Sequence, residues 1–299
     1  MQWRLPLRPQ RNKLMQLLVV CSKLVVSLTL TSLLLACANT TRSGAVGINR
    51  SQFLAVSASE VDRLSAISYN DQNQKAKEKN ILITSGPAYD RLKAISNRLI
   101  AQTAIFRDDT QQWNWQLVLI NAPILNATCA PGGKITFYTG LIEQLNLNDD
   151  EIAAIMGHEI AHALREHGRE RLSQAMAQSA VANIAMAVAG PYGSAVSAAN
   201  QAAQYVLVLP NSRQNESEAD AIGLELAARA GYNPRAAISV WQKMNKATDG
   251  KGTFEFLSTH PSGDTRIEQL TELMPAVEPL YSSSAKPAAS KLKTQKNKN

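Results

Sequence analysis

The 299-residue sequence contains little cysteine, and this scarcity limits what can hold the fold together. Its three cysteines are Cys21, Cys37 and Cys129, and the first two lie in or beside an N-terminal segment that has the pattern of an export signal. A single remaining thiol cannot form a disulfide within one chain. The folded part must therefore depend on its hydrophobic core or on a bound metal, and we expect Cys129 to be a small buried apolar residue.

Long hydrophobic runs are also missing. The uncharged apolar stretch 24–36 has 13 residues, whereas a helix needs about 20 to cross a bilayer. It follows five basic residues and precedes Cys37, which is typical of a secretory signal. Its end, Leu34-Leu35-Ala36-Cys37, resembles the lipobox of bacterial lipoproteins, and this implies that Cys37 is lipidated and becomes the mature N-terminus. The alternative is a plain signal-anchor helix with an incidental cysteine.

The positive net charge does not extend to the body of the chain. Of the 31 Lys and Arg residues behind the net charge of +7, five precede residue 37 and five lie in the last 14 positions, and neither end carries an acidic residue. Residues 38–280 hold 21 basic and 24 acidic side chains. This balance lacks the basic surface that nucleic-acid binding requires, so we expect no nucleic acid as a partner.

Composition divides the chain into four parts. We expect a lipoprotein signal peptide over 1–36, a lipidated Cys37 with a tether over 37–52, a folded domain over 53–280 and a disordered Lys-rich tail over 281–299. Position 38 is alanine and not aspartate. By resemblance to enterobacterial lipoproteins, this implies a cell-envelope protein that is anchored in the outer membrane and faces the periplasm.

Hydrophobic periodicity predicts both helices and strands in the body. One helix has a clear start, since Asn148 can cap it and Glu151 stands at the third helical position, so we expect it to run from Asp149 to about Glu166. A later Ala-rich region, 172–209, is helix-prone and interrupted at 190–193. The other expected elements are helices over 51–79, 88–103 and 212–230, and strands over 113–120 and 134–139.

The capped helix carries the sequence His158-Glu159-Ile160-Ala161-His162. Histidines four residues apart lie about 40° apart around a helix, so both rings can face one cation. Glu159 lies on the same side, where its carboxylate can reach a metal-bound water. The pattern is typical of zinc peptidases, in which the imidazoles bind the metal and the glutamate is the base.

Zinc needs a third protein ligand, and two regions offer one. If the helix continues, His167 lies about 140° around it from the metal face, so we do not expect that residue to bind. Downstream, Glu216 and Asp220 share one helix face, where one carboxylate can bind zinc while the other accepts the second N–H of a ligand histidine. Glu218 is a competing third ligand, and solvated helix carboxylates are the alternative interpretation.

Taken together, these segments resemble the gluzincins of metallopeptidase family forty-eight, the HtpX and prenyl-protein endopeptidase type. The resemblance covers about residues 120–270, through the HExxH motif, the segment Ser212–Gly223 and Thr259-His260-Pro261. In layout it is nearest to the periplasmic lipoprotein branch of LoiP and BepA. It implies an α+β fold, mainly helical and zincin-like, with a small β-sheet beside the active-site helix.

The resemblance also implies roles for individual residues. It makes Glu159 the base and Asp220 the partner of a ligand, both catalytic, and it implies one Zn²⁺ ion per chain. His260 matches a histidine that can occupy the open position of the metal, either as a latch that substrate must displace or as a donor to the oxyanion. The implied zinc ligands are His158, His162 and Glu216.

The implied activity is that of a zinc metalloendopeptidase that hydrolyses misfolded or damaged cell-envelope proteins. Its partners would be unfolded or misassembled envelope proteins, together with the membrane that holds the lipid anchor. The strand near 134–139 could pair with an extended substrate. The competing interpretation is a non-catalytic assembly or chaperone lipoprotein whose zinc site is structural, closed by His260 as a fourth ligand, but such a site has no use for Glu159.

Overall fold

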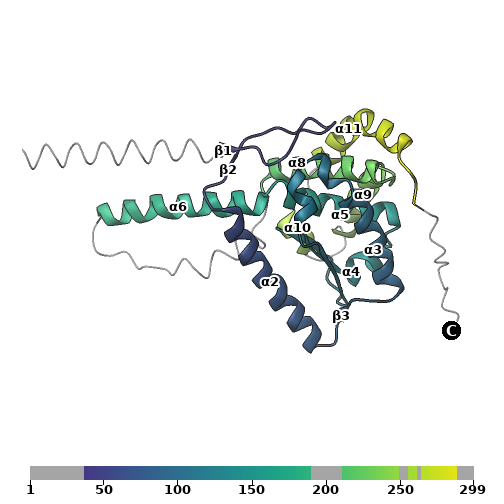
Figure 1. The fold of residues 1–299 in the computed structure, drawn as a ribbon, viewed down its shortest axis with the longest axis horizontal. Coiled ribbons are helices and arrows are strands. Elements are labelled where there is room, and N and C mark those ends of the chain that lie inside the picture. Colours follow the sequence, from purple (N-terminus) through teal and green to yellow (C-terminus); the bar gives the residue numbers. More distant parts are fainter. Residues whose placement is uncertain (1–36, 190–210, 249–254, 261–263, 288–299) are drawn as a thin grey trace, which may run out of the picture.

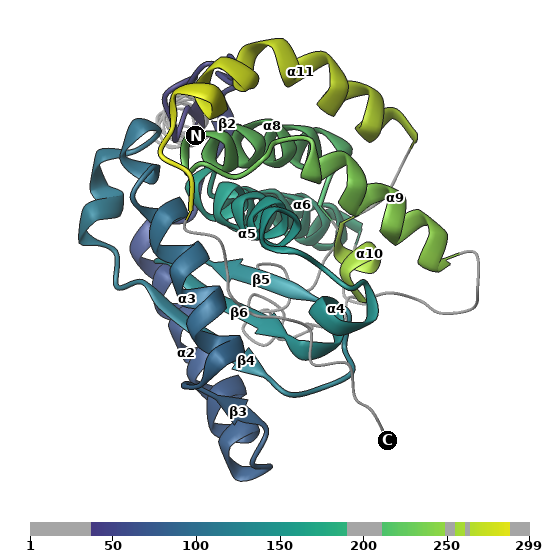
Figure 2. The same ribbon diagram turned by 90° about the vertical axis from the view of Figure 1, so that its right-hand side faces the viewer.

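The computed structural model describes residues 37–189, 211–248, 255–260 and 264–287. Within these ranges the expected mainly helical α+β fold with a small sheet is confirmed (Figures 1 and 2). The expected break at 190–193 and the signal segment lie outside the described residues. No helix in the described part has the length and apolar content that a membrane crossing requires. The helices are α2 (Ala58–Glu78), α3 (Pro87–Ile100), α4 (Thr139–Gln144), α5 (Asp149–Leu164), α6 (His167–Ala189), α8 (Arg213–Arg229), α9 (Ala236–Thr248), α10 (Glu255–Thr259) and α11 (Asp264–Ser283), with 3₁₀ turns at Thr103–Ile105 and Asp108–Gln112.

The main sheet is mixed and has the strand order β3-β4-β6-β5. Strands β4 and β6 are parallel, with Gln116 opposite Lys134, while β3 and β5 are antiparallel to their neighbours. β6, the strand expected near 134–139, is thus paired on both sides and has no free edge for a substrate. The edge strands are the two-residue β3 and the longer β5, and hydrophobic periodicity did not predict β5. The strands are β3 (Leu82–Ile83), β4 (Gln116–Ile120), β5 (Ala127–Ala130) and β6 (Lys134–Tyr138).

Three helices, α5, α8 and α11, lie in successive layers on the β5 side of the sheet. α5 lies against β5, α8 crosses α5 on its other side, and α11 covers α8 (Figure 2). Contacts on both sides leave nearly every residue of α5 beyond its first turn buried. Each fully buried Leu, Ile, Phe or Met side chain in this stack stabilises the fold by about 1.5–3 kcal/mol. The buried side chains at its centre include Leu99, Phe137, Ile152, Met156, Ile160, Ile222 and Leu226, and Cys129 of β5 packs among them.

Local contacts determine where α5 begins and where it ends. At its start the Asn148 side chain accepts from the Glu151 N–H and the Glu151 carboxylate accepts from the Asn148 N–H, both at 2.9 Å, as the capping pattern predicts. The helix ends at Leu164 and not at Glu166, because Glu166 adopts a positive φ of 50°. The chain turns there, and a new helix, α6, begins at His167 and extends beyond the body (Figure 1).

Two further helices bear on the expected boundaries. α8 begins after Ser212, whose hydroxyl accepts from the Asn215 N–H at 3.1 Å, and the chain leaves it through Gly231 with a φ of 86°. α11 continues past residue 280, where the tail was expected to begin, and ends at Ser283.

Residues 37–53 differ from the expected tether, because they pack on the domain. β1 (Cys37–Ala38) pairs with β2 (Gln52–Phe53), and Cys37 is exposed opposite Phe53. Between the two strands the chain runs along the body, and Thr41 is buried like Gln52. We call residues 39–52 the N-terminal strap. Its polar composition resembles that of a linker, but the polar side chains find buried partners that lie far away in the sequence.

Candidate metal centre

The site lies beside the point where α5 and α8 cross, and there the two backbones touch at Gly157 and Gly223. A Cβ atom on Gly157 would lie 2.8 Å from the Gly223 carbonyl oxygen, closer than atoms pack, so the crossing requires glycine on α5. The close approach brings the carboxylates of α8 to the histidines of α5. This pair was not among the predicted site residues, although a glycine inside each helical segment was a usable signal.

Four potential ligands converge in the crossing, and they include the three that the family resemblance implied, together with His260. His162 Nε2 lies 3.0 Å from His158 Nε2 and 3.3 Å from Glu216 Oε1. His260 Nδ1 lies 3.2 Å from His158 Nε2 and 3.0 Å from Glu216 Oε1. All four side chains are buried. Tetrahedral zinc with bonds of about 2.0–2.1 Å separates its ligand atoms by about 3.3 Å, so these spacings fit one such ion.

The hydrogen-bond partners of His158 support that interpretation. Its Nδ1 lies 2.9 Å from Asp220 Oδ1, so Nδ1 carries the proton that the carboxylate accepts. Its Nε2 lone pair then faces other ring nitrogens and a carboxylate, an arrangement that repels unless a cation or a proton lies between them. A set of imidazole and carboxylate ligands suits Zn²⁺.

Arg266 of α11 holds Glu216 and Asp220 of α8 in place, and no sequence pattern had indicated this arginine. Its Nε and Nη2 donate to Asp220 Oδ2 and Oδ1 at 2.7 Å, and its Nη1 lies 2.8 Å from Glu216 Oε2. Burial raises the pKa of Asp220, but Arg266 and the hydrogen bond from His158 outweigh that effect and lower it. The arginine thus keeps a buried carboxylate ionised beside the cluster. Its place in a different helix, after the Thr-His-Pro segment, offered no pattern to read.

Glu159 follows His158 on α5 and is 3% exposed. Its Oε1 has no hydrogen-bond partner among the described residues and lies 3.4 Å from His260 Nε2. Burial raises the pKa of this carboxyl, and the nearby rings of His260 and His158 lower it only in part. A raised pKa brings a carboxylate closer to the range in which it can take up and release a proton near neutrality.

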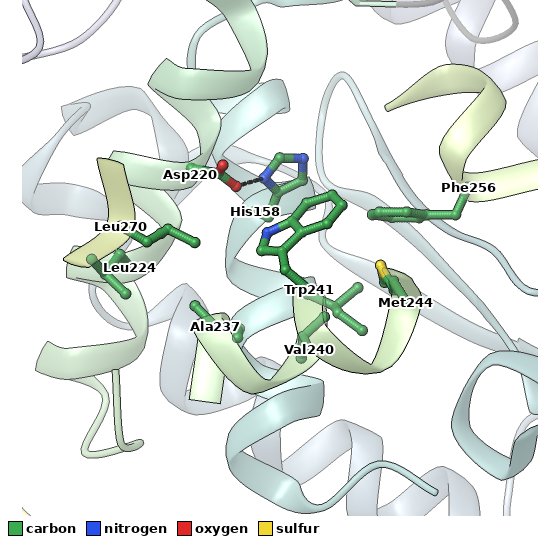
Figure 3. A pocket seen from close by; sticks show the side chains of 11 residues that line it. His158, Asp220, Leu224, Ala237, Val240, Trp241, Met244, Phe256 and Leu270 are labelled. Atoms are coloured by element: carbon green, nitrogen blue, oxygen red, sulfur yellow. Dashed lines mark hydrogen bonds and ion pairs between the residues drawn. The ribbon is translucent and has the colours of Figure 1, made fainter. Parts of the chain in front are cut away.

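Two hollows adjoin the cluster. One is lined by Thr128 and Cys129 of the edge strand β5, together with Glu159 and His162. The other is apolar and adjoins His158 and Asp220 (Figure 3). Phe256 of this second pocket stacks its ring on His260, which lines the first hollow, with centroids 4.3 Å apart, so aromatic packing holds the His260 ring in its position. The other aromatic and sulfur-containing side chains of the pocket are Trp241 and Met244.

His167 and Glu218 both lie outside the cluster of four. The expectation that α5 would continue to His167 and turn this residue away from the metal face was wrong, because α5 ends at Leu164. His167 Nδ1 lies 2.8 Å from His162 Nδ1, behind the ligand and outside the four-residue cluster. Glu218, the competing third ligand, points away from the cluster and accepts from Arg165 Nε at 2.9 Å.

Comparison with known proteins agrees with this geometry. Residues 88–274 match the model of Peptidase family M48, which is more than half of the chain. The mitochondrial metalloendopeptidase OMA1 of Arabidopsis thaliana is 37% identical over 53% of this chain and 31% of its own length. OMA1 of Saccharomyces cerevisiae is 35% identical over 57% of this chain and 50% of its own length.

A more distant relative is the β-barrel assembly-enhancing protease of Escherichia coli, 29% identical over 50% of this chain and 32% of its own length. The chain thus spans between about a third and a half of these relatives. The match to the family model includes all four residues of the buried cluster. The chain therefore belongs to peptidase family M48, a family of metalloendopeptidases.

Proposed function

We propose that the chain is a zinc-dependent endopeptidase in which Glu159 is the general base. The observation that carries the proposal is the buried cluster of three imidazoles and Glu216 beside an ionisable carboxyl whose Oε1 has no hydrogen-bond partner in the described part of the chain. When bound there, zinc would supply a Lewis acid for the scissile carbonyl and make a water molecule more acidic.

The chain's own residues account for the proton transfers and the ligand geometry. Glu159 takes the proton of the attacking water and passes it to the leaving amine, a task that suits its raised pKa. Asp220 holds the proton-bearing Nδ1 of His158, which keeps the Nε2 lone pair directed into the cluster. Arg266 balances the negative charge of Asp220 and Glu216.

The unpaired edge of β5 is our proposed binding site for an extended substrate. Its residues Thr128 and Cys129 line the hollow that contains Glu159, so a peptide added as a further strand would pass the base. Recognition through backbone hydrogen bonds depends little on sequence and needs an unfolded segment. This favours misfolded or damaged proteins as substrates, and the export-signal pattern favours proteins of the cell envelope.

The anchor and location are part of the same proposal. Cys37 is exposed at the start of β1, where a lipid could be attached without disturbing the core. With the lipobox-like sequence before it, this supports a lipoprotein that is anchored in the outer membrane and faces the periplasm. The membrane and unfolded or misassembled envelope proteins are then its partners.

One observation favours a second candidate, a structural or latched zinc site in a non-catalytic assembly or chaperone lipoprotein. His260 Nδ1 lies within the ligand cluster, where it would complete four protein ligands, and closed zinc sites are usually structural. The buried Glu159 argues against a purely structural site, because an ionisable side chain in that position costs stability unless it serves a reaction.

The decisive test compares the wild type with Glu159→Gln for zinc content and for cleavage of casein. We expect about one zinc per chain in both proteins and a loss of cleavage of about 10²-fold or more in the variant. Glu143→Gln, an exposed position in α4, is the matched control and should cleave like the wild type. Full zinc occupancy without cleavage by the wild type would favour the second candidate, a structural or latched zinc site.

A further inference from the structure

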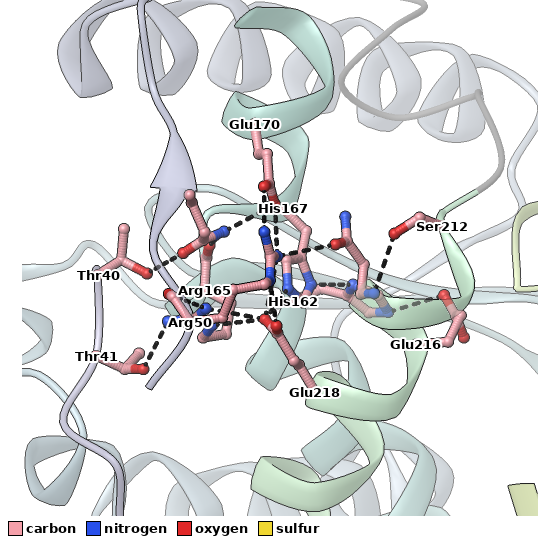
Figure 4. A network of polar contacts seen from close by, with 12 residues as sticks. Thr40, Thr41, Arg50, His162, Arg165, His167, Glu170, Ser212, Glu216 and Glu218 are labelled. Atoms are coloured by element: carbon pink, nitrogen blue, oxygen red, sulfur yellow. Dashed lines mark hydrogen bonds and ion pairs between the residues drawn. The ribbon is translucent and has the colours of Figure 1, made fainter. Parts of the chain in front are cut away.

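A chain of polar contacts leads from His162 to the N-terminal strap (Figure 4). His162 Nδ1 lies 2.8 Å from His167 Nδ1, and His167 Nε2 lies 3.2 Å from Glu218 Oε2. Glu218 is in turn held by Arg165 of the α5–α6 turn and by Arg50 of the strap. The contacts thus connect a metal ligand to a segment more than 100 residues earlier in the sequence.

Arg50 enters this cluster as a bridge between two buried carboxylates. Its guanidinium lies 2.5 Å from Glu170 Oε1 and 2.9 Å from Glu170 Oε2, and its Nε donates to Glu218. The Glu170 and Glu218 side chains are 2% and 6% exposed. Because a buried carboxylate is destabilised when it loses a cation, loss of Arg50 would disturb Glu170 and would leave Glu218 to Arg165 and His167.

Arg165 joins the same cluster from the other side and fastens the strap to it. Its side chain is fully buried, and its Nη2 donates to the Arg50 carbonyl at 2.9 Å. Its Nη1 donates to Asn39 Oδ1 at 2.5 Å and to Thr41 Oγ1 at 3.2 Å. The strap therefore supplies both a charge to Glu218 and the anchors that hold Arg165.

The protonation of each group in the chain follows from the one before it. If His162 offers its Nε2 lone pair to a metal, its Nδ1 carries a proton and must donate it. The acceptor is His167 Nδ1, so His167 Nε2 carries a proton and donates to Glu218, which must be ionised. One arrangement of protons thus satisfies every contact.

We propose that Arg50 of the strap acts through Glu218 and His167 to position His162 for metal binding. These three are positioning residues, and the strap is a component of the metal centre and not a spacer. The proposal rests on the metal site of the proposed function, but it does not depend on peptide hydrolysis.

The test measures the zinc affinity of the full chain by competition with a chelator. Removal of a hydrogen-bond partner from a ligand histidine weakens zinc binding about 10- to 100-fold, and we expect a loss of that size in Arg50→Ala and in His167→Ala, with zinc still near one per chain at saturation. His167→Asn should recover most of the affinity, because its amide oxygen can accept from His162 Nδ1. His167→Leu should not, since it restores only the volume.

A double variant separates positioning from general loosening of the fold. If Arg50 acts through His167, Arg50→Ala with His167→Ala should lose no more affinity than the worse single variant, whereas independent effects would multiply. Arg42→Ala is the control on the same strap, because Arg42 pairs with Asp108 and the Ala104 carbonyl away from the metal. It should bind zinc like the wild type.

Three results would overturn the proposal: unchanged affinity in folded Arg50→Ala, multiplicative losses in the double variant, or rescue by His167→Leu as good as by His167→Asn. If Arg50→Ala does not fold, the two His167 substitutions decide the question. Failure of zinc binding in the wild type would instead refute the metal site itself. If the zinc affinities follow the expected pattern but the wild type cleaves no peptide bond, only the proposed function is refuted.

Discussion

Gly223 of α8 lies so close to α5 that a methyl group on it would be 2.6 Å from the His158 backbone nitrogen. The two helices therefore touch through their backbones at the level of the first ligand histidine. On α8, Glu216 and Asp220 come shortly before Gly223. The crossing therefore sets the distance between these carboxylates and the imidazoles of α5. The spacing within the metal centre therefore depends on the absence of a side chain at Gly223.

Gly223→Ala should weaken both the fold and the metal site. The added methyl group must push α8 away from α5, and such overpacking costs about 1–3 kcal/mol. We expect a lower midpoint in urea unfolding and a weaker zinc affinity in the same protein. A variant that loses neither would show that the backbones can separate without moving the carboxylates.

Asp220→Ala should weaken zinc binding about 10- to 100-fold. The substitution removes the acceptor that holds His158 Nδ1 at 2.9 Å and leaves Arg266 with one buried carboxylate partner fewer. Zinc affinity by chelator competition measures the effect. Asp90→Ala, in an exposed position of α3, is the matched control and should retain wild-type affinity. Equal affinities in the two variants would contradict the assigned role.

His260→Ala separates the two roles considered for this histidine. In the structure His260 Nδ1 lies in the ligand cluster, the position of a latch. We therefore expect the variant to keep zinc and to cleave casein faster than the wild type, because no side chain must be displaced. The oxyanion role predicts the opposite sign, a fall in turnover of about 10²-fold or more with zinc retained. Slower cleavage by a zinc-loaded variant would defeat the latch.

Glu151→Gln should reduce stability at neutral pH and have little effect in acid. Burial raises the pKa of Glu151, but Lys243, the Asn148 N–H and Ser239 outweigh it and lower the pKa below its usual value of 4.5. The ionised form is therefore favoured in the fold, and its contribution is present above pH 4.5 and is lost as the pH falls through the lowered pKa.

Urea unfolding at pH 7 and pH 3 measures that contribution. We expect a difference of about 1–3 kcal/mol between wild type and Glu151→Gln at pH 7, the size of a hydrogen bond to a charged group. The difference should shrink at pH 3. A constant difference at both values of pH would show that shape, and not ionisation, explains the effect.

Much of the centre was predictable because its parts are local. The HExxH spacing places His158 and His162 on one face of a helix by geometry alone, and the capping box of Asn148 and Glu151 marked where that helix begins. The stop at Gly231 was equally local. The pairing of Glu216 with Asp220 across one turn of α8 also follows from spacing. These features need no knowledge of the rest of the chain.

The remaining features depend on contacts between distant segments, which no local pattern encodes. The positive φ of Glu166 turns His167 behind His162, and β5 becomes an edge strand only through its antiparallel pairing with β6. Arg266 and Arg50 come from opposite ends of the chain and are recognisable only by the buried carboxylates that they neutralise. The sequence by itself predicted the helix that carries His158 and His162, and the family resemblance added Glu216 and His260. The tertiary structure decided which charges surround them, since burial makes an unpaired charge costly and only the folded chain shows where each partner lies.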